Sequence, residues 1–258
     1  MNKFLSGLLL AGLLSISAQA DFVRVEAGVG MWSQSIDGTI KYDNNPAFTT
    51  DTLGYGTVEN PYAWIFIKHP IPILPNLRLE YAAVEFSGTS TQNFMFLNKP
   101  FPAGTTSSLT MDQIDAILYY NILDNTFWTT IDLGLDIKTM QGAFKADVTT
   151  PLGSIINVDE STNLVIPMAY GRLRVELPIT DIGGELEVKY LEYSGSKVLD
   201  ASIKVDYTLV DIIPFVDLGI EVGYRKQTID LDSSDISSLN TSLKLDVDGA
   251  FIGIVGRF

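Results

Sequence analysis

Few side chains in this sequence could carry out catalysis. The chain holds a single histidine, His69, and no cysteine. His69 precedes Pro70 in a proline-rich stretch, whereas a general base needs a hydrogen-bond partner and a nucleophile within reach. Because the sequence indicates neither, we predict that the protein is not an enzyme and uses no cofactor. His69 is then a polar residue at a turn.

Candidate metal ligands are almost all carboxylates. One histidine without cysteine cannot build a zinc site. The acidic run from Asp230 to Asp235 could offer oxygen ligands to Ca²⁺, but it lacks the glycine and the terminal glutamate of an EF-hand loop. We favour a solvated acidic loop over a calcium site and predict no metal centre.

Most other charged residues alternate with apolar ones. Between Phe127 and Ile137 the odd-numbered positions are apolar apart from one threonine, whereas the even-numbered positions include Asp132 and Asp136. A period of two is typical of a β-strand whose two faces meet different surroundings. The length of this apolar face matches the roughly 9–11 residues that a tilted transmembrane strand needs.

Ten segments carry this pattern, and short connections mostly alternate with long ones. The segments are residues 22–34, 61–69, 77–87, 110–122, 127–139, 163–177, 184–194, 197–210, 215–227 and 241–258. The long connections, predicted as outer loops, are near residues 35–60, 88–109, 140–162 and 228–240. The chain is therefore predicted to be all-β, a single up-and-down antiparallel transmembrane β-barrel of ten strands.

Two of these segments leave eight strands as the alternative. The second segment is apolar on both faces, and the apolar residues of the last segment change phase. We predict a β-bulge at Asp248-Gly249, which would restore that phase.

Length, charge and the first residues narrow the function further. The chain has 258 residues and a formal net charge of −14, which argues against binding to nucleic acid. Residues 1–20 have the pattern of a signal peptide, in which Lys3 supplies the positive charge and Ala18 and Ala20 fit the cleavage site. Residues 21–258 are predicted to form the barrel domain.

The last predicted strand ends at Phe258. Together with the signal peptide, this strand resembles the outer-membrane β-barrel proteins of Gram-negative bacteria, in particular the small barrels without an assigned role. The resemblance implies that Phe258 is the assembly signal for the barrel-assembly machinery. It also implies localisation in the cell outer membrane, in contact with lipid and lipopolysaccharide, after cleavage of the signal peptide and transit through the periplasm. We expect a monomer.

If the apolar faces meet lipid, the charged faces line the lumen. Nine cations would then point inward, namely Arg24, Arg78, Lys138, Arg172, Arg174, Lys189, Lys204, Arg225 and Arg257. Twelve carboxylates would face them, namely Glu26, Glu80, Asp115, Asp132, Asp136, Glu176, Glu185, Glu187, Asp200, Asp206, Asp217 and Glu221.

Charges confined in a barrel must pair or stay hydrated, and a barrel of about eight strands is just filled by its side chains. We therefore predict a narrow, salt-bridged lumen and a structural or surface-interaction role. The alternative is a small channel with a weak preference for cations, because the inward carboxylates outnumber the inward cations.

Overall fold

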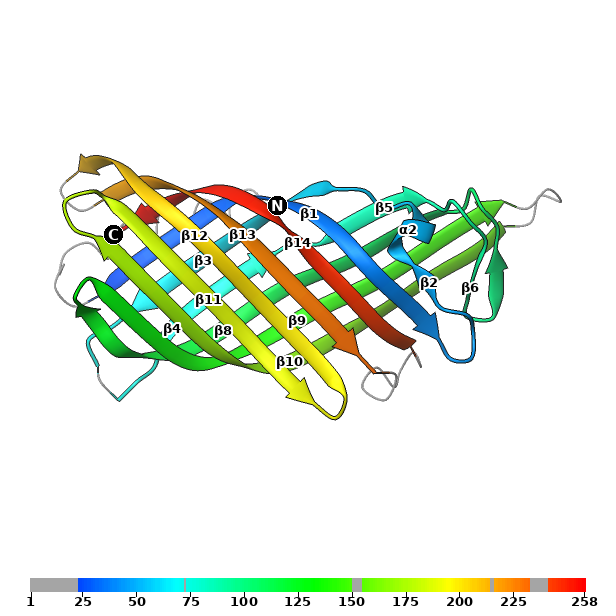
Figure 1. Ribbon diagram of the computed structural model, residues 1–258, viewed down its shortest axis with the longest axis horizontal. Coiled ribbons are helices and arrows are strands. Elements are labelled where there is room, and N and C mark those ends of the chain that lie inside the picture. The colour runs from blue at the N-terminus through cyan, green and yellow to red at the C-terminus, as the bar shows by residue number, and fades with distance from the viewer. Residues whose placement is uncertain (1–22, 72, 150–154, 214–215, 233–240) are drawn as a thin grey trace, which may run out of the picture.

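A computed structural model of the chain describes residues 23–71, 73–149, 155–213, 216–232 and 241–258 (Figure 1). The predicted signal peptide, with Ala18 and Ala20, lies outside these residues. Strands form most of the described chain, and its one helix, α2 (Thr50–Leu53), has four residues. Among the described residues, no helix has the length and apolar character needed to cross a bilayer.

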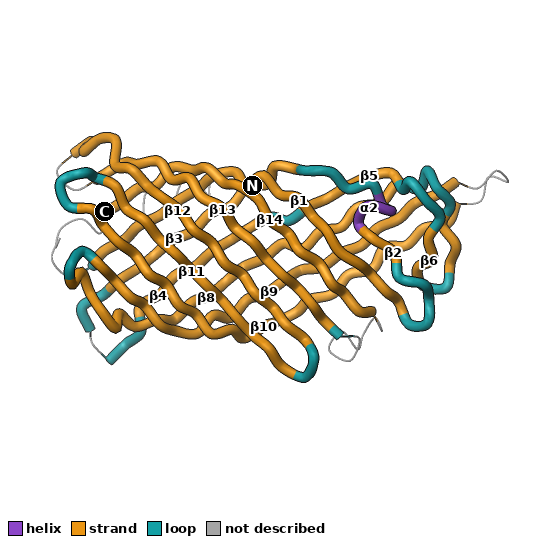
Figure 2. The backbone as a smooth tube through the Cα atoms, viewed as in Figure 1, coloured by secondary structure: helices purple, strands orange, loops and turns teal. Residues whose placement is uncertain are grey.

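Ten strand positions form a closed antiparallel barrel (Figures 1 and 2). In chain order they are β1 (Arg24–Tyr42), β3 (Val58–Lys68), β4 (Asn76–Ala82) continued by β5 (Glu85–Thr89), β8 (Thr106–Thr126), β9 (Thr129–Thr149), β10 (Ile155–Leu177), β11 (Ile182–Tyr193), β12 (Ser196–Ile213), β13 (Val216–Leu231) and β14 (Thr241–Arg257). Each pairs with the next, and β14 pairs with β1 to close the wall. The predicted ten-stranded up-and-down barrel is confirmed, and the alternative of eight strands is wrong.

Several strands continue beyond their predicted ends. Strand β1 extends to Tyr42, and β9 and β10 remain paired out to Thr149 and Ile155. Among the described residues, the predicted loop at 140–162 is therefore mostly strand, whereas the predicted loop at 35–60 is strand at its two ends and at Phe48–Thr49. The sequence pattern does not reveal these strand residues, because their apolar side chains face the interior and their polar side chains face outward, the reverse of the preceding segment.

The two faces of the wall exchange their character partway along the strands. On β9, Leu133 and Leu135 are 52% and 67% exposed, whereas Asp136 is buried inside the barrel. Farther along the same strand Phe144 is buried and Lys145 is exposed. We call this change the polarity exchange. An apolar exterior fits lipid, whereas an apolar interior with a polar exterior fits water.

The polarity exchange divides the barrel into two parts, which we call the membrane half and the distal half. The last outward apolar residues of the membrane half are Met31, Ile114, Ile137, Val165, Tyr224 and Ala250. The next outward residues, which begin the distal half, are Ser33, Asp112, Thr139, Asn163, Lys226 and Asp248. Strand pairing places these positions at about one level, because Thr139 lies opposite both Ile114 and Val165.

The polarity exchange also explains the phase change in β14. Ile252 points outward in the membrane half, whereas Val247 is buried in the distal half. Strand β14 keeps one register with each neighbour on both sides of Asp248. The predicted bulge at Asp248-Gly249 is therefore wrong, and the apolar residues change face because their surroundings change.

Short elements fill and cover the distal half. Strand β2 (Phe48–Thr49) pairs with β1, and β6 (Phe94–Phe96) and β7 (Lys99–Phe101) form a separate hairpin. The rings of Phe48 and Phe94 are 5.0 Å apart, and the ring of Phe96 is 4.9 Å from that of Phe144 on β9. The distal half therefore has a hydrophobic core in place of a lumen.

Contacts at both ends of helix α2 fix its position. The Thr49 hydroxyl accepts a hydrogen bond from the Thr52 N–H at 3.1 Å, which caps the first turn. Gly54 ends the helix with φ 73°, and a Cβ there would lie 2.3 Å from the Thr89 carbonyl oxygen. Only glycine meets both requirements, so this position fastens the helix against β5.

Tyr55 follows the helix and is buried in the distal half. Its ring lies 6.1 Å from that of Phe86 in a stacked arrangement. Burial raises the pKa of Tyr55 to about 12, and the nearby Ser107 hydroxyl opposes part of that rise. The hydroxyl is thus neutral in the folded protein at any physiological pH.

Candidate functional site

The candidate site is the interior of the membrane half. Sixteen of the twenty-one predicted lumen charges are buried there, namely Glu26, Arg78, Glu80, Asp115, Asp132, Asp136, Lys138, Arg172, Arg174, Glu185, Glu187, Lys189, Asp200, Lys204, Asp206 and Glu221. The side chain of Arg225 is 11% exposed. Arg24, Glu176 and Asp217 are more accessible and lie near the ends of their strands, close to the short turns. Strand alternation places these groups inside because their neighbours in sequence face lipid.

Arg172 lies at the centre of the interior. Its Nη1 is 2.6 Å from Asp132 Oδ2 on β9, and its Nη2 is 2.7 Å from Glu185 Oε2 on β11. Its guanidinium lies 4.8 Å from the ring centroid of Phe66. A buried guanidinium needs this many partners, since each unpaired polar group in a low-dielectric interior is costly.

A second group of ion pairs joins strands on opposite sides of the barrel. Arg78 on β4 contacts Glu80 at 2.5 Å, Glu187 at 3.1 Å and Glu185 at 3.3 Å. Lys189 is fully buried and pairs with Glu80 and with Glu187, the latter at 3.3 Å. These contacts connect β4 with β11 across the interior.

A third group lies next to the polarity exchange. Lys138 contacts Asp115 at 2.7 Å and Asp200 at 3.1 Å, and Arg225 contacts Asp200 at 2.6 Å. The Gln227 amide nitrogen donates to the Gln113 side-chain oxygen at 2.8 Å. These amides separate the charged interior from the apolar core.

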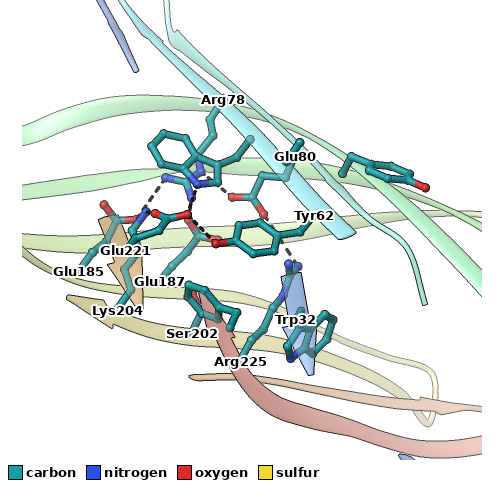
Figure 3. A pocket seen from close by; sticks show the side chains of 14 residues that line it. Trp32, Tyr62, Arg78, Glu80, Glu185, Glu187, Ser202, Lys204, Glu221 and Arg225 are labelled. Atoms are coloured by element: carbon teal, nitrogen blue, oxygen red, sulfur yellow. Dashed lines mark hydrogen bonds and ion pairs between the residues drawn. The ribbon is translucent and has the colours of Figure 1, made fainter. Parts of the chain in front are cut away.

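Aromatic residues of β3 complete the site, and the sequence reasoning missed their role. The Tyr62 hydroxyl and the Trp64 indole nitrogen both donate to Glu221 Oε1, at 2.8 and 2.9 Å (Figure 3). Lys204 lies 4.2 Å from the Trp64 ring centroid and 2.9 Å from Glu221 Oε2. The missed signal is the alternation of large aromatic residues with Ala63 and isoleucines along a strand that is apolar on both faces.

The space left between these side chains is small. The cavity shown in Figure 3 has a volume of about 40 Å³. That volume holds a few water molecules at most. Trp32, Tyr62 and Arg225 line it, and the charged groups around it already have partners. This part of the interior is therefore largely filled by side chains.

Asp136 differs from the other buried charges. It is buried, and neither of its carboxylate oxygens meets a hydrogen-bond donor among the described residues. Its cross-strand neighbours are Ile117 and Met168, both buried and apolar. Its carboxyl group lies within hydrogen-bonding reach of that of Asp115, and Lys138 and Lys189 act on it electrostatically.

The turn end of the barrel is closed by ion pairs. Arg174 Nη1 is 2.8 Å from Asp206 Oδ1, and Arg257 also pairs with Asp206. Arg24 bridges Glu26 at 2.7 Å and Glu176 at 3.2 Å. Outside these pairs lies a shallow mouth of about 320 Å³.

The last residue takes part in barrel closure. The Phe258 N–H donates to the Val25 carbonyl oxygen at 2.8 Å, which continues the pairing of β14 with β1. Its side chain is 38% exposed. Recognition of Phe258 by the assembly machinery stays a prediction.

His69 is engaged by backbone groups of its own turn. Its Nε2 lies 3.0 Å from the Pro75 carbonyl oxygen, and its Nδ1 accepts the Ile71 N–H at 3.1 Å. These contacts brace the proline-rich turn. In the part of the chain that the structure describes, no three or more acidic, histidine or cysteine side chains gather in a way that could hold a metal ion.

Comparisons with known proteins give no family assignment. No family model matches the chain, and no curated protein is similar in sequence. Among solved structures, the outer-membrane protease OmpT of Escherichia coli is 9% identical with a TM-score of 0.48, over 93% of this chain and 96% of its own.

Two further solved structures are more distant. Ail, the attachment invasion locus protein of Yersinia pestis, is 8% identical with a TM-score of 0.34, over 92% of this chain and 99% of its own. A mutant of the monoaromatic hydrocarbon channel TodX is 9% identical with a TM-score of 0.32, over 94% of this chain and 91% of its own. The fold is established by the closed wall and the apolar exterior of the membrane half, which are those of a transmembrane β-barrel.

Proposed function

We propose that the protein is a non-conducting outer-membrane barrel that holds its distal half outside the cell, in a structural or surface-interaction role. The observation that carries the proposal is the filled interior. Ion pairs such as Arg172 with Asp132 at 2.6 Å occupy the membrane half, and a hydrophobic core occupies the distal half. An ion would meet paired charges first and an apolar barrier second.

The surface of the distal half supports an interaction role. Its carboxylates among the described residues are Asp37, Asp43, Asp51, Glu59, Glu85, Asp112, Asp147, Asp159, Glu160, Glu192, Asp230, Asp232, Asp246 and Asp248. Its cations are Lys41, Lys99, Lys145, Lys197, Lys226 and Lys244. An acidic excess of this size favours cationic or basic partners and speeds their encounter with the surface.

The remaining parts of the proposal concern placement in the cell. The short turns would lie in the periplasm, and the membrane half would contact lipid and lipopolysaccharide. The predicted signal peptide and Phe258 would direct export and assembly. A monomer suffices, because the wall is closed by β1 and β14 of the same chain.

Single-channel recording in planar bilayers tests the closed interior. We expect no steady openings from refolded protein whose folding is verified by heat modifiability on gels. Steady openings that Asp132→Asn reduces would establish the alternative, a small cation-preferring channel. Openings on the scale of general porins would refute the filled interior altogether.

A further inference from the structure

The distal half contains an apolar cavity that plays no part in anchoring. It has a volume of about 70 Å³ and lies between β8, β9 and β10 on one side and the start of β14 on the other. Met111, Met140 and Leu164 line it. Gly142 keeps part of it open, since a Cβ there would lie 3.2 Å from the Thr162 methyl group.

The wall is open beside this cavity. Strand β10 pairs with β11 only from Ala169 onward, so among the described residues its stretch from Val158 to Met168 pairs with β9 alone. Figure 2 shows β9 and β10 continuing well past the hairpin of β11 and β12. Because this stretch belongs mostly to the distal half, a ligand could reach the cavity from water.

One carboxylate interrupts the apolar lining. Glu160 of β10 lines the cavity and is partly exposed. It has no ion-pair partner among the described side chains, whereas its neighbour Asp159 pairs with Lys145 at 3.3 Å. An apolar cavity with an uncompensated carboxylate at its edge suits a molecule that combines a hydrocarbon chain with a positive charge.

We propose that this cavity binds the alkyl chain of a small cationic amphiphile, with the cationic head group facing Glu160. A dry cavity of about 150 Å³ accommodates benzene, so one of about 70 Å³ holds roughly three carbon atoms. Each buried methylene strengthens binding about fourfold. A chain of four carbons, three of them buried, should therefore bind about sixtyfold more tightly than methylammonium, which has none to bury.

Methionine methyl groups provide a readout for this site. In full-length mature protein in lipid nanodiscs, carbon-13 methyl spectra would be recorded while n-butylammonium is added. We expect saturable shifts of Met111 and Met140, which line the cavity, and not of Met31, which is 42% exposed on the lipid-facing wall. Shifts confined to Met31 would show partition into lipid and would overturn the proposal.

Variants distinguish the cavity that would bind the alkyl chain from the carboxylate that would face the head group. Gly142→Val should abolish the shifts by filling the cavity, whereas Gly171→Val is the matched control, because a Cβ at Gly171 meets only the Leu133 side chain at 3.8 Å. Glu160→Gln should weaken n-butylammonium roughly two- to fivefold, as for a partly exposed ion pair, and leave 1-butanol unchanged. Equal responses of the wild type and a folded Gly142→Val protein would refute the site.

Binding of an anion of the same length completes the test. Binding of n-butanoate as tight as that of n-butylammonium would refute the role of Glu160. Because the readout is local to the distal half, it is independent of conductance, and failure here would leave the non-conducting barrel standing.

Discussion

Replacing Arg172 by methionine should destabilise the barrel strongly. The change keeps most of the side-chain volume but removes the cation that meets Asp132 at 2.6 Å and Glu185 at 2.7 Å. Glu185 retains Arg78 at 3.3 Å and Lys204 at 3.4 Å. Among the side chains that the structure describes, Asp132 would retain the Asn121 amide alone as a hydrogen-bond partner.

The size of the effect follows from this imbalance. Removing one partner of a buried pair typically costs about 3–5 kcal/mol, because the other charge stays buried and uncompensated. For Arg172→Met we expect a loss of about 3–5 kcal/mol in the free energy of unfolding. The double variant Arg172→Met/Asp132→Asn should recover about 2 kcal/mol of that loss, since it removes the stranded charge.

Equilibrium unfolding in urea, with the protein in lipid vesicles, measures these values. Fluorescence of Trp32 and Trp64 reports opening of the interior, since both are buried there. Lys145→Met is the matched control, because Lys145 pairs with Asp159 at 3.3 Å while both side chains are more than half exposed. We expect the control to cost less than about 1 kcal/mol. A cost for Arg172→Met no larger than that of the control would refute the view that buried ion pairs hold the interior together.

Three further predictions test the two halves of the barrel. Because the chain has no cysteine, single cysteines report exposure cleanly: Gln141→Cys should react with an impermeant maleimide on intact cells, whereas Leu135→Cys on the same face of β9 should not, and the reverse result would contradict the polarity exchange. The folded pKa of Tyr55, about 12, lies above the unfolded value of about 10, so its contribution is present below pH 10 and is lost as the pH rises towards 12. Urea unfolding at pH 9 and pH 11.5 should show the wild type losing about 2 kcal/mol more than Tyr55→Phe, and an equal loss would exclude burial as the cause. Gly54→Ala should cost about 1–3 kcal/mol locally and increase tryptic cleavage at Lys41, whereas Gly56→Ala, where a Cβ meets nothing within 4 Å, should leave cleavage unchanged.

The sequence predicted the membrane half well and the distal half poorly. In the membrane half, the alternation of Leu133 and Leu135 with Asp132 and Asp136 identifies the strand and its two faces. Once a membrane is assumed, the apolar face must meet lipid and the charged face must line the interior. Alternation alone does not say which face meets water, so its continuation in the opposite sense was interpreted as loops and, in β14, as a bulge.

The sequence also could not predict which charged side chains pair with one another. Arg172 lies directly across from Asp132 in the pairing of β10 with β9, but its second partner, Glu185, lies on β11. Such contacts depend on register and on how far each side chain reaches across the interior. Hydrophobic patterning determines the face of a residue and not its neighbour on the next strand.

The polarity exchange has a consequence for assembly. A slip of one residue turns every side chain of a strand to the opposite face. On β9 such a slip would push Asp132 and Asp136 into lipid and, along the same strand, turn Phe144 towards water. A single misalignment would then place charged side chains in lipid and apolar side chains in water. Both placements raise the free energy, so the bilayer and the solvent each favour the correct register of a long strand. In a barrel confined to the membrane, only the bilayer penalises a wrong register.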